Sequence, residues 1–341
     1  MKALVLERLA DLTRERHPLQ LKDLPVPVPA AGEILIRVNA CGVCHTEIDE
    51  IEGRAVSRLP VVPGHQVVGK VEKTGPEANL FQPGTRVGVG WIFSACGACP
   101  YCLKGLENLC PDFRGTGMDA DGGYAEYMTV PDRFACRIPD VLSDYETAPL
   151  LCAGAIGYRS LRLANLHNGE NIGLTGFGGS GHLVLKMIRY KFPDSRVFVF
   201  ARNPREQAFA LELGASWAGD IPDPCPERMQ AIIDTTPVWK PVLASLDMLA
   251  PGGRLVINAI RKESTDQNAL LQLDYSKHLW QEKEIKSVAN VTRADIVEFL
   301  ELAAASGIRP DYELYPMEEA NRALHELKTG KIRGAKVLQI A

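Results

Sequence analysis

The chain has 341 residues, of which 46% are hydrophobic and 23% charged, as expected for a globular protein of about two domains. A net charge of −4 argues against a large nucleic-acid-binding surface. The sequence contains no run of about 18 apolar residues, so no membrane-spanning helix is predicted. The N-terminal apolar stretch is too short for a signal peptide core, so the nine cysteines are expected to be reduced thiols in the cytoplasm.

The first third of the chain predicts short β-strands. Alternating or valine-rich runs cover residues 33–39, 67–72 and 86–89, and glycine- and proline-containing turns separate them. Frequent turns between short runs of this kind favour a β-rich, barrel-like domain.

Four cysteines follow within one short segment: Cys96, Cys99, Cys102 and Cys110. Two-residue gaps let successive thiolates point inward from a tight loop, and zinc accepts four such ligands in a closed tetrahedron. A [4Fe–4S] centre and a disulfide cluster are the alternatives, although cysteines so close in a tight loop bridge poorly. We expect a structural zinc, which leaves no coordination position for a substrate.

From about residue 154 the pattern changes to strands that alternate with helices, which predicts a doubly wound parallel sheet. The expected strands cover residues 171–174, 196–200, 231–234 and 254–258, and the expected helices 182–190 and 204–213. Near residue 292 the pattern changes again, to helices at 293–305 and 317–328 and a closing strand at 335–340.

A glycine-rich turn joins the first strand of this series to the helix that follows, and its glycines are Gly176, Gly178, Gly179 and Gly181. Glycines in a strand–turn–helix setting let the backbone approach a pyrophosphate, whose charge the helix N-terminus favours. A plain tight turn is the alternative. We expect a dinucleotide site.

The end of the second strand bears on the choice of coenzyme. Folds that bind NAD usually place a carboxylate there for the ribose 2′-hydroxyl, whereas this chain has Ala201, Arg202 and, three residues on, Arg205. Because arginine pairs well with a phosphate, we predict NADP(H) over NAD(H). The alternative is that both arginines are solvated charges at the start of a helix.

Several local motifs together carry a resemblance to a known family. They are Gly42-Val-Cys44, Pro63-Gly-His65, the cysteine segment, Asp121-Gly-Gly-Tyr-Ala-Glu126, Leu151-Cys-Ala-Gly154 and the glycine turn. Over essentially its whole length the chain resembles the zinc-dependent alcohol dehydrogenases of the medium-chain dehydrogenase/reductase family. The resemblance implies an α/β protein with a discontinuous, β-rich GroES-like catalytic domain (residues 1–153 and 292–341) and a Rossmann domain (residues 154–291).

The resemblance also implies a second, catalytic zinc held by Cys44, His65 and Cys152, with its fourth position open, so that two zinc ions are expected per chain. Cys41 is an alternative first ligand, which spacing alone does not exclude. The positions of Thr46 and Glu47 after Cys44 match the family motif and favour Cys44. Thr46 matches the family's proton-relaying hydroxyl, and Glu47 stands where the family usually has an aspartate that holds the ligating histidine.

The implied reaction interconverts alcohols with aldehydes or ketones by hydride transfer to or from a nicotinamide coenzyme. Trp91 matches an aromatic wall of the substrate pocket, and Ala55 stands where ethanol-preferring relatives carry a bulky residue, so we expect medium-sized or aromatic substrates. A homotetramer or homodimer is expected. The alternative is a family member that reduces an activated C=C bond, of the enoyl or quinone type, although such relatives generally lack the catalytic zinc ligands.

Four positions depart from the family pattern. Gln66 replaces the glutamate that commonly follows the ligating histidine, and Asp49 replaces a histidine at the end of the proton relay. Ile156 stands where a hydroxyl often contacts the nicotinamide. Ala335 replaces an arginine that meets the pyrophosphate, a role for which Arg333 and Lys336 are candidates.

Overall fold

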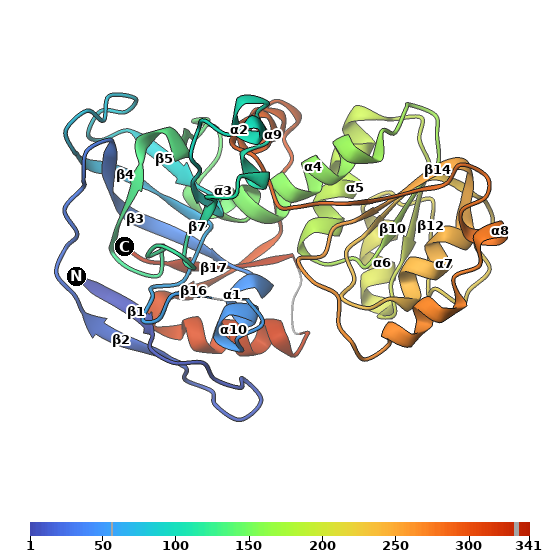
Figure 1. Cartoon of the computed structure of the whole chain (residues 1–341), viewed down its shortest axis with the longest axis horizontal. Coiled ribbons are helices and arrows are strands. Elements are labelled where there is room, and N and C mark those ends of the chain that lie inside the picture. Colours follow the sequence, from blue (N-terminus) through green and yellow to red (C-terminus); the bar gives the residue numbers. More distant parts are fainter. Residues whose placement is uncertain (56, 331–333) are drawn as a thin grey trace. The chain divides into compact units, whose positions relative to one another are not determined.

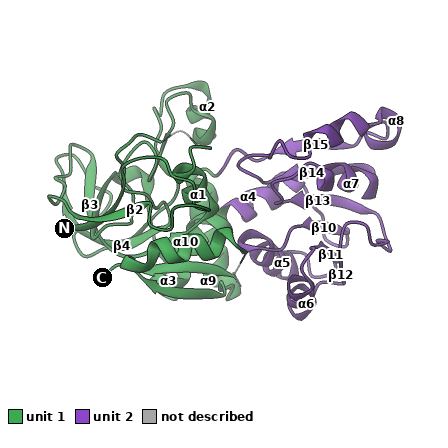
Figure 2. Cartoon of the chain, turned by 90° about the horizontal axis from the view of Figure 1, so that it is seen from below, with its two compact units in different colours: residues 1–155, 291–341 green, residues 156–290 purple. Residues whose placement is uncertain are grey.

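The computed structural model divides the chain into two compact units (Figures 1 and 2). Unit 1 comprises Met1–Ala155 and Val291–Ala341, and unit 2 comprises Ile156–Asn290. The bounds expected from the sequence differ from these by two residues at most. The structure describes residues 1–55, 57–330 and 334–341. Among these, none of the helices combines the length and apolar character needed to span a bilayer.

Unit 1 is built mainly from antiparallel strands. Some of its helices precede unit 2 in the sequence and the others follow it. Its strands are β1 (Lys2–Leu6), β2 (Leu19–Asp23), β3 (Glu33–Val43), β4 (Val67–Thr74), β5 (Arg86–Val89), β6 (Ile92–Ser94), β7 (Arg114–Gly115), β8 (Tyr127–Pro131), β9 (Ala135–Arg137), β16 (Tyr312–Pro316) and β17 (Ala335–Gln339). Its helices are α1 (His45–Ile51), α2 (Pro100–Leu103), α3 (Asp144–Pro149), α9 (Arg293–Ser306) and α10 (Ala320–Lys328).

Strand β3 organises the main sheet of unit 1, whose strand order is β16-β17-β3-β4-β5-β9. Its first half pairs with β8 and its second half with β17, while β4 runs along its other side. Strand β3 is buried over most of its length, in keeping with its run of apolar residues. The C-terminal end of β3 leads directly into α1, so the position of α1 is fixed by the sheet.

Unit 2 is a six-stranded parallel sheet in the order β12-β11-β10-β13-β14-β15. Its strands are β10 (Ile172–Thr175), β11 (Val197–Phe200), β12 (Trp217–Gly219), β13 (Met229–Asp234), β14 (Leu249–Ile257) and β15 (Glu284–Ser287). Its helices are α5 (Gly179–Lys191), α6 (Pro204–Glu212), α7 (Lys240–Met248) and α8 (Tyr275–His278), and α4 (Ala155–Ala164) leads into it from unit 1. The strand order reverses between β10 and β13, which is the switch point where such sheets bind ligands.

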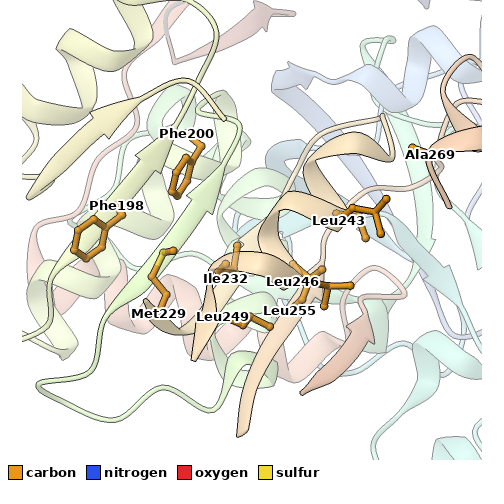
Figure 3. Packing of buried hydrophobic residues seen from close by; sticks show 10 residues of the cluster. Phe198, Phe200, Met229, Ile232, Leu243, Leu246, Leu249, Leu255 and Ala269 are labelled. Carbon is orange, nitrogen blue, oxygen red and sulfur yellow. The ribbon is translucent and has the colours of Figure 1, made fainter. Parts of the chain in front are cut away.

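A hydrophobic cluster between the sheet and α7 holds unit 2 together (Figure 3). Phe198 and Phe200 of β11 and Ile232 of β13 lie on the sheet side, and Leu246 of α7 packs against them, each at most 2% exposed. Burial of a large apolar side chain stabilises the folded state by about 1.5–3 kcal/mol, so this cluster is a main source of stability in the unit.

The expected α/β architecture is confirmed: a β-rich part and a doubly wound parallel sheet both form. One expected helix begins later than its sequence pattern predicts. The helix expected over 317–328 begins as a 3-10 turn at Met317–Glu319, and the α-helix starts only at Ala320. Pro316 precedes this turn in an extended conformation and lacks a backbone N–H, so the segment starts as a tight turn after the strand.

Candidate active site

Three expected metal-binding side chains lie together in unit 1. The sulfur atoms of Cys44 and Cys152 are 4.0 Å apart, and Nε2 of His65 lies 3.2 Å from the sulfur of Cys152. All three donor atoms lie within 4.8 Å of one another. Two thiolates and an imidazole are donors that zinc prefers, and three ligands leave one position of a tetrahedron open, so this set fits a catalytic zinc ion.

Each ligand is placed by a distinct local structure. Cys44 is the N-cap of α1, and Cys152 lies in a π-helical turn, Leu150–Gly154, which widens the helix between α3 and α4. His65 follows Gly64, which has a φ of +99°, and a Cβ at that position would lie only 2.4 Å from the Tyr124 ring, so only glycine fits there.

The structure also separates the two candidates for the first ligand. Cys41 lies on β3, fully buried and outside the group of donor atoms, whereas Cys44 belongs to it. Cys44 is therefore the cysteine whose sulfur is available to the same ion as His65.

Glu47 connects two of the ligands. One carboxylate oxygen lies 2.6 Å from Nδ1 of His65, and the other accepts a 2.7 Å hydrogen bond from the backbone N–H of Cys44. Glu47 is fully buried. The carboxylate therefore fixes the imidazole with Nε2 toward the two sulfurs, as outer carboxylates do in metal sites.

The donor groups change one another's pKa values. The hydrogen bond with Cys152 holds the pKa of Cys44 well below its usual value although burial opposes this, and the same contact raises the pKa of Cys152. Burial disfavours a charged His65, but the neighbouring Glu47 outweighs it and raises the pKa of the imidazole. Because zinc binds deprotonated thiols and a neutral imidazole, its binding releases the protons that these groups carry.

Two further side chains of α1 lie beside this set. The Thr46 hydroxyl is 3.6 Å from the sulfur of Cys44. Glu50, one turn beyond, is 1% exposed, and burial together with Glu47 raises its pKa well above the usual range. Sequence reasoning missed Glu50; the signal was a third carboxyl group on a helix that carries a ligand at its start.

The four cysteines of the second set also converge. Sulfur–sulfur distances are 3.5 Å between Cys96 and Cys110 and 3.9 Å between Cys96 and Cys102. Backbone N–H groups of Ala98 and Cys99 point at the sulfur of Cys96 and lower its pKa to about 7. All nine cysteines of the chain are unpaired, so disulfides do not account for the set. Four sulfurs in one cluster fit a closed tetrahedral zinc.

In unit 2, the glycine turn runs from the end of β10 into α5. Gly176 has a φ of +84°, and a Cβ there would lie 2.6 Å from the Thr235 hydroxyl, so only glycine fits. Gly178 is the N-cap of α5, which begins at Gly179 and includes Gly181. The turn therefore presents backbone N–H groups and a helix N-terminus at the carboxyl edge of the sheet.

The end of β11 carries the residues expected to select the coenzyme. Ala201 is buried and donates its N–H to Gly219, while Arg202 and Arg205 are exposed. Asn203 caps α6 by accepting the N–H of Arg205. The structure thus leaves both guanidinium groups available on the surface next to the strand end.

Comparison with known proteins identifies the family of the chain. Residues 30–140 match the model of the alcohol dehydrogenase GroES-like domain. A probable alcohol dehydrogenase, AdhA, of Mycobacterium tuberculosis is 44% identical over 95% of this chain and 93% of its own length. The chain belongs to the zinc-dependent alcohol dehydrogenases of the medium-chain dehydrogenase/reductase family.

Further relatives of this dehydrogenase also match it over nearly the whole length of both chains. An alcohol dehydrogenase of Geobacillus stearothermophilus is 33% identical over 95% of this chain and 96% of its own. The structure of a cinnamyl alcohol dehydrogenase of Sorghum bicolor is 27% identical, with a TM-score of 0.84 over 98% of this chain and 97% of that chain. The enzyme is therefore similar to these dehydrogenases over both units.

The departures from the family pattern have visible consequences in the structure. Asp49 is paired with Arg54 at 2.7 Å, so a charged pair stands where relatives have a histidine. Lys336 is 1% exposed and bound to Glu313 at 3.0 Å inside unit 1, so it does not replace the pyrophosphate-binding arginine missing at Ala335. Arg333, the other candidate, lies outside the described residues.

The residues expected near the substrate lie on two loops of unit 1. Trp91 is half-buried between β5 and β6, with its ring 4.8 Å from that of Phe113. Ala55 lies in the turn after α1, where its N–H binds the carbonyl of Asp49. Gln66 is buried beside His65, and Ile156 is half-buried at the start of unit 2.

Proposed function

We propose that this alcohol dehydrogenase holds two zinc ions per chain. The catalytic ion is bound by Cys44, His65 and Cys152, and the structural ion by the four cysteines of the Cys96–Cys110 segment. The convergence of two thiols and one imidazole is the observation that carries the proposal, because three ligands leave the fourth position of a tetrahedral zinc for the substrate. A reductase of activated C=C bonds without catalytic zinc would contain one ion per chain.

The chain's own residues prepare the reaction. Glu47 holds the imidazole of His65 in place, and its buried charge favours a cation at the site. Thr46 is placed to accept the substrate's hydroxyl proton and pass it outward. The zinc ion supplies a Lewis acid that favours loss of that proton, and the nicotinamide coenzyme exchanges the hydride.

NADP(H) is the proposed coenzyme. The strand end at Phe200 lacks a carboxylate, and the Arg202 guanidinium is exposed two residues further on. An arginine pairs with a 2′-phosphate, while a carboxylate there would repel it.

The test compares kcat/KM for NADPH and NADH. We expect the wild type to prefer NADPH, and Arg202→Ala to lose most of this preference while activity with NADH is unchanged. A wild-type enzyme that prefers NADH would contradict the proposal.

Medium-sized or aromatic alcohols and aldehydes are the proposed substrates, because Ala55 leaves room where a bulky side chain would close the pocket. The cinnamyl alcohol dehydrogenase of Sorghum bicolor is a structural relative, which supports this size class. In a series from ethanol to benzyl and cinnamyl alcohol, kcat/KM should rise with size, and Ala55→Trp should reverse the trend. Highest activity on ethanol would overturn this part.

A homodimer or homotetramer that pairs through unit 2 is also proposed. Strand β15 ends the sheet, and Ile285, Trp280 and Tyr275 nearby are 46%, 65% and 62% exposed. An exposed strand edge with apolar neighbours favours pairing with a second copy. Light scattering should give a mass of two or four chains, and Ile285→Lys should lower it; a monomeric wild type would contradict the proposal.

A further inference from the structure

The catalytic metal set has a third acidic neighbour that the ligand arrangement does not use. Glu50 lies on α1, and its side chain is 1% exposed. Among the described residues, neither of its carboxyl oxygens has a hydrogen-bond partner. A buried carboxyl group without a partner is costly, so a native fold that keeps one needs a reason.

Helix geometry directs this carboxyl group toward the metal set. Glu50 is three residues after Glu47 and four after Thr46, and such neighbours share one face of a helix. Long side chains in helices lean toward the N-terminus, so Glu50 covers the turn that contains Glu47 and Thr46. That turn begins at Cys44, the N-cap and a metal ligand.

The electrostatic surroundings of Glu50 agree with this direction. Its carboxyl group interacts with the charges of Glu47, His65 and Cys44, which are the supporting carboxylate and two of the three ligands. Asp49, another buried acid of the helix, is paired with Arg54 at 2.7 Å, whereas no described residue forms a hydrogen bond or ion pair with the Glu50 carboxyl group.

We propose that Glu50 is a second outer carboxyl group of the catalytic metal centre, which stabilises the bound cation by its charge without being one of the three ligands. The proposal deepens the proposed function and rests on it. A dication beside the orphaned carboxylate removes the cost of burying it, and the carboxylate in turn raises the affinity for the dication. Glu50 is thus a positioning residue for the metal.

Zinc affinity tests the proposal without reference to activity. The fully loaded protein is titrated with a coloured zinc chelator, and release is followed for the two sites separately. In Glu50→Gln we expect the catalytic site to bind zinc about 10- to 100-fold more weakly, as is typical when an outer partner of a metal ligand is removed. The structural site should be unchanged, which makes it an internal control for folding.

Two further variants sharpen the result. Glu52→Gln removes a carboxyl group at the end of α1 that Lys328 and Arg54 already neutralise, so it should leave both zinc affinities unchanged. Glu50→Met, which is apolar and of similar length, is a second variant in case Glu50→Gln folds poorly. It also removes the charge, so it should weaken zinc binding at the catalytic site to the same extent. Unchanged catalytic-site affinity in both Glu50 variants, or equal weakening at both sites, would overturn the inference. A wild type that binds one zinc ion would instead overturn the proposed function.

Discussion

Glu47 shows how one side chain can serve both local folding and chemistry. Its carboxylate caps the first turn of α1 by binding the N–H of Cys44, and the same group holds His65. The ligand at the start of the helix and the ligand before β4 are therefore connected by one buried carboxylate. The longer glutamate reaches the histidine at 2.6 Å, so it can replace the family's usual aspartate.

Thr46 is the residue for which a variant separates proton transfer from metal binding. Thr46→Ala should lower kcat by about 100-fold, because removal of a positioned proton carrier typically costs 10²–10⁴ in rate. Thr46→Ser, which keeps the hydroxyl, should retain most of the activity. Both should contain as much zinc as the wild type; an alanine variant with full kcat would show that the hydroxyl is a turn-forming group only.

For single residues, the sequence predicts the metal ligands better than the residues that surround them. Spacing identified the four-cysteine set, and the resemblance supplied Cys44, His65 and Cys152. The third carboxyl group of the helix is visible in the sequence, but only the three-dimensional packing reveals that Glu50 is buried and has no hydrogen-bond partner among the described residues. Likewise the pairing of Lys336 with Glu313 and Glu326 depends on how β16, β17 and α10 pack together, which the sequence pattern does not show.

At the scale of elements, a buried carboxylate ties the cysteine segment to α9. Glu107, in the short turn before Cys110, accepts hydrogen bonds from the backbone N–H of Arg293 at 3.1 Å and from its Nε at 2.9 Å. Burial opposes the charge of Glu107, but hydrogen bonds from the backbone and from Arg293 outweigh it and lower its pKa. The loop is thereby braced against the helix that follows the return to unit 1.

This contact gives a pH-dependent contribution to stability. A lowered pKa means that the contribution is complete above the unfolded value of about 4.3 and is lost as the pH falls through the folded value. Glu107→Gln should cost about 1–2 kcal/mol in urea unfolding at pH 7, and the difference from wild type should shrink below pH 4. Glu301→Gln, at an exposed position of the same helix, serves as the control; a constant difference at all pH values would contradict the assignment.

The loops at the carboxyl edge of unit 2 are held by another buried pair. Lys262, after β14, contacts the carboxylate of Asp234 at the end of β13 and donates to the carbonyls of Thr236 and Val238 at 2.8 and 3.0 Å. Asp234 also accepts the hydroxyl of Thr175, directly before the glycine turn. Three loops of the expected coenzyme edge therefore share one ion pair.

Removal of one partner tests this pair. Lys262→Met leaves a fully buried carboxylate unpaired, which should destabilise the protein by about 3–5 kcal/mol in urea unfolding. Lys286→Met, on the exposed edge strand β15, should change stability by about 0.5 kcal/mol or less. Equal stabilities of the two variants would show that the pair is not important for the fold.

Most elements follow their sequence patterns because pattern and burial agree. The strands of unit 2 were expected as apolar runs, and each of β10 and β11 is buried at every position. The π-helical turn around Cys152 could not be expected, because one extra residue in a helical turn leaves no signal in hydrophobic periodicity. That turn contains a metal ligand, where departures from regular structure are common.

At the scale of the whole molecule, the two metal sets have separate tasks. The four-cysteine set is closed and belongs to a loop braced by Glu107 and Arg293, whereas the set at Cys44 is open and carries the supporting carboxylate. Both sets lie in unit 1, and the glycine turn lies in unit 2. Removal of the catalytic metal is therefore expected to leave the fold intact.

The zinc content and activity of Cys152→Ser test this claim most directly. The wild type should contain two zinc ions per chain and oxidise alcohols. The variant should retain one zinc ion, at the four-cysteine set, and lose activity, while Cys41→Ser, at the cysteine outside the set, should retain both ions and full activity. A Cys152→Ser enzyme with two zinc ions and undiminished activity would contradict the account.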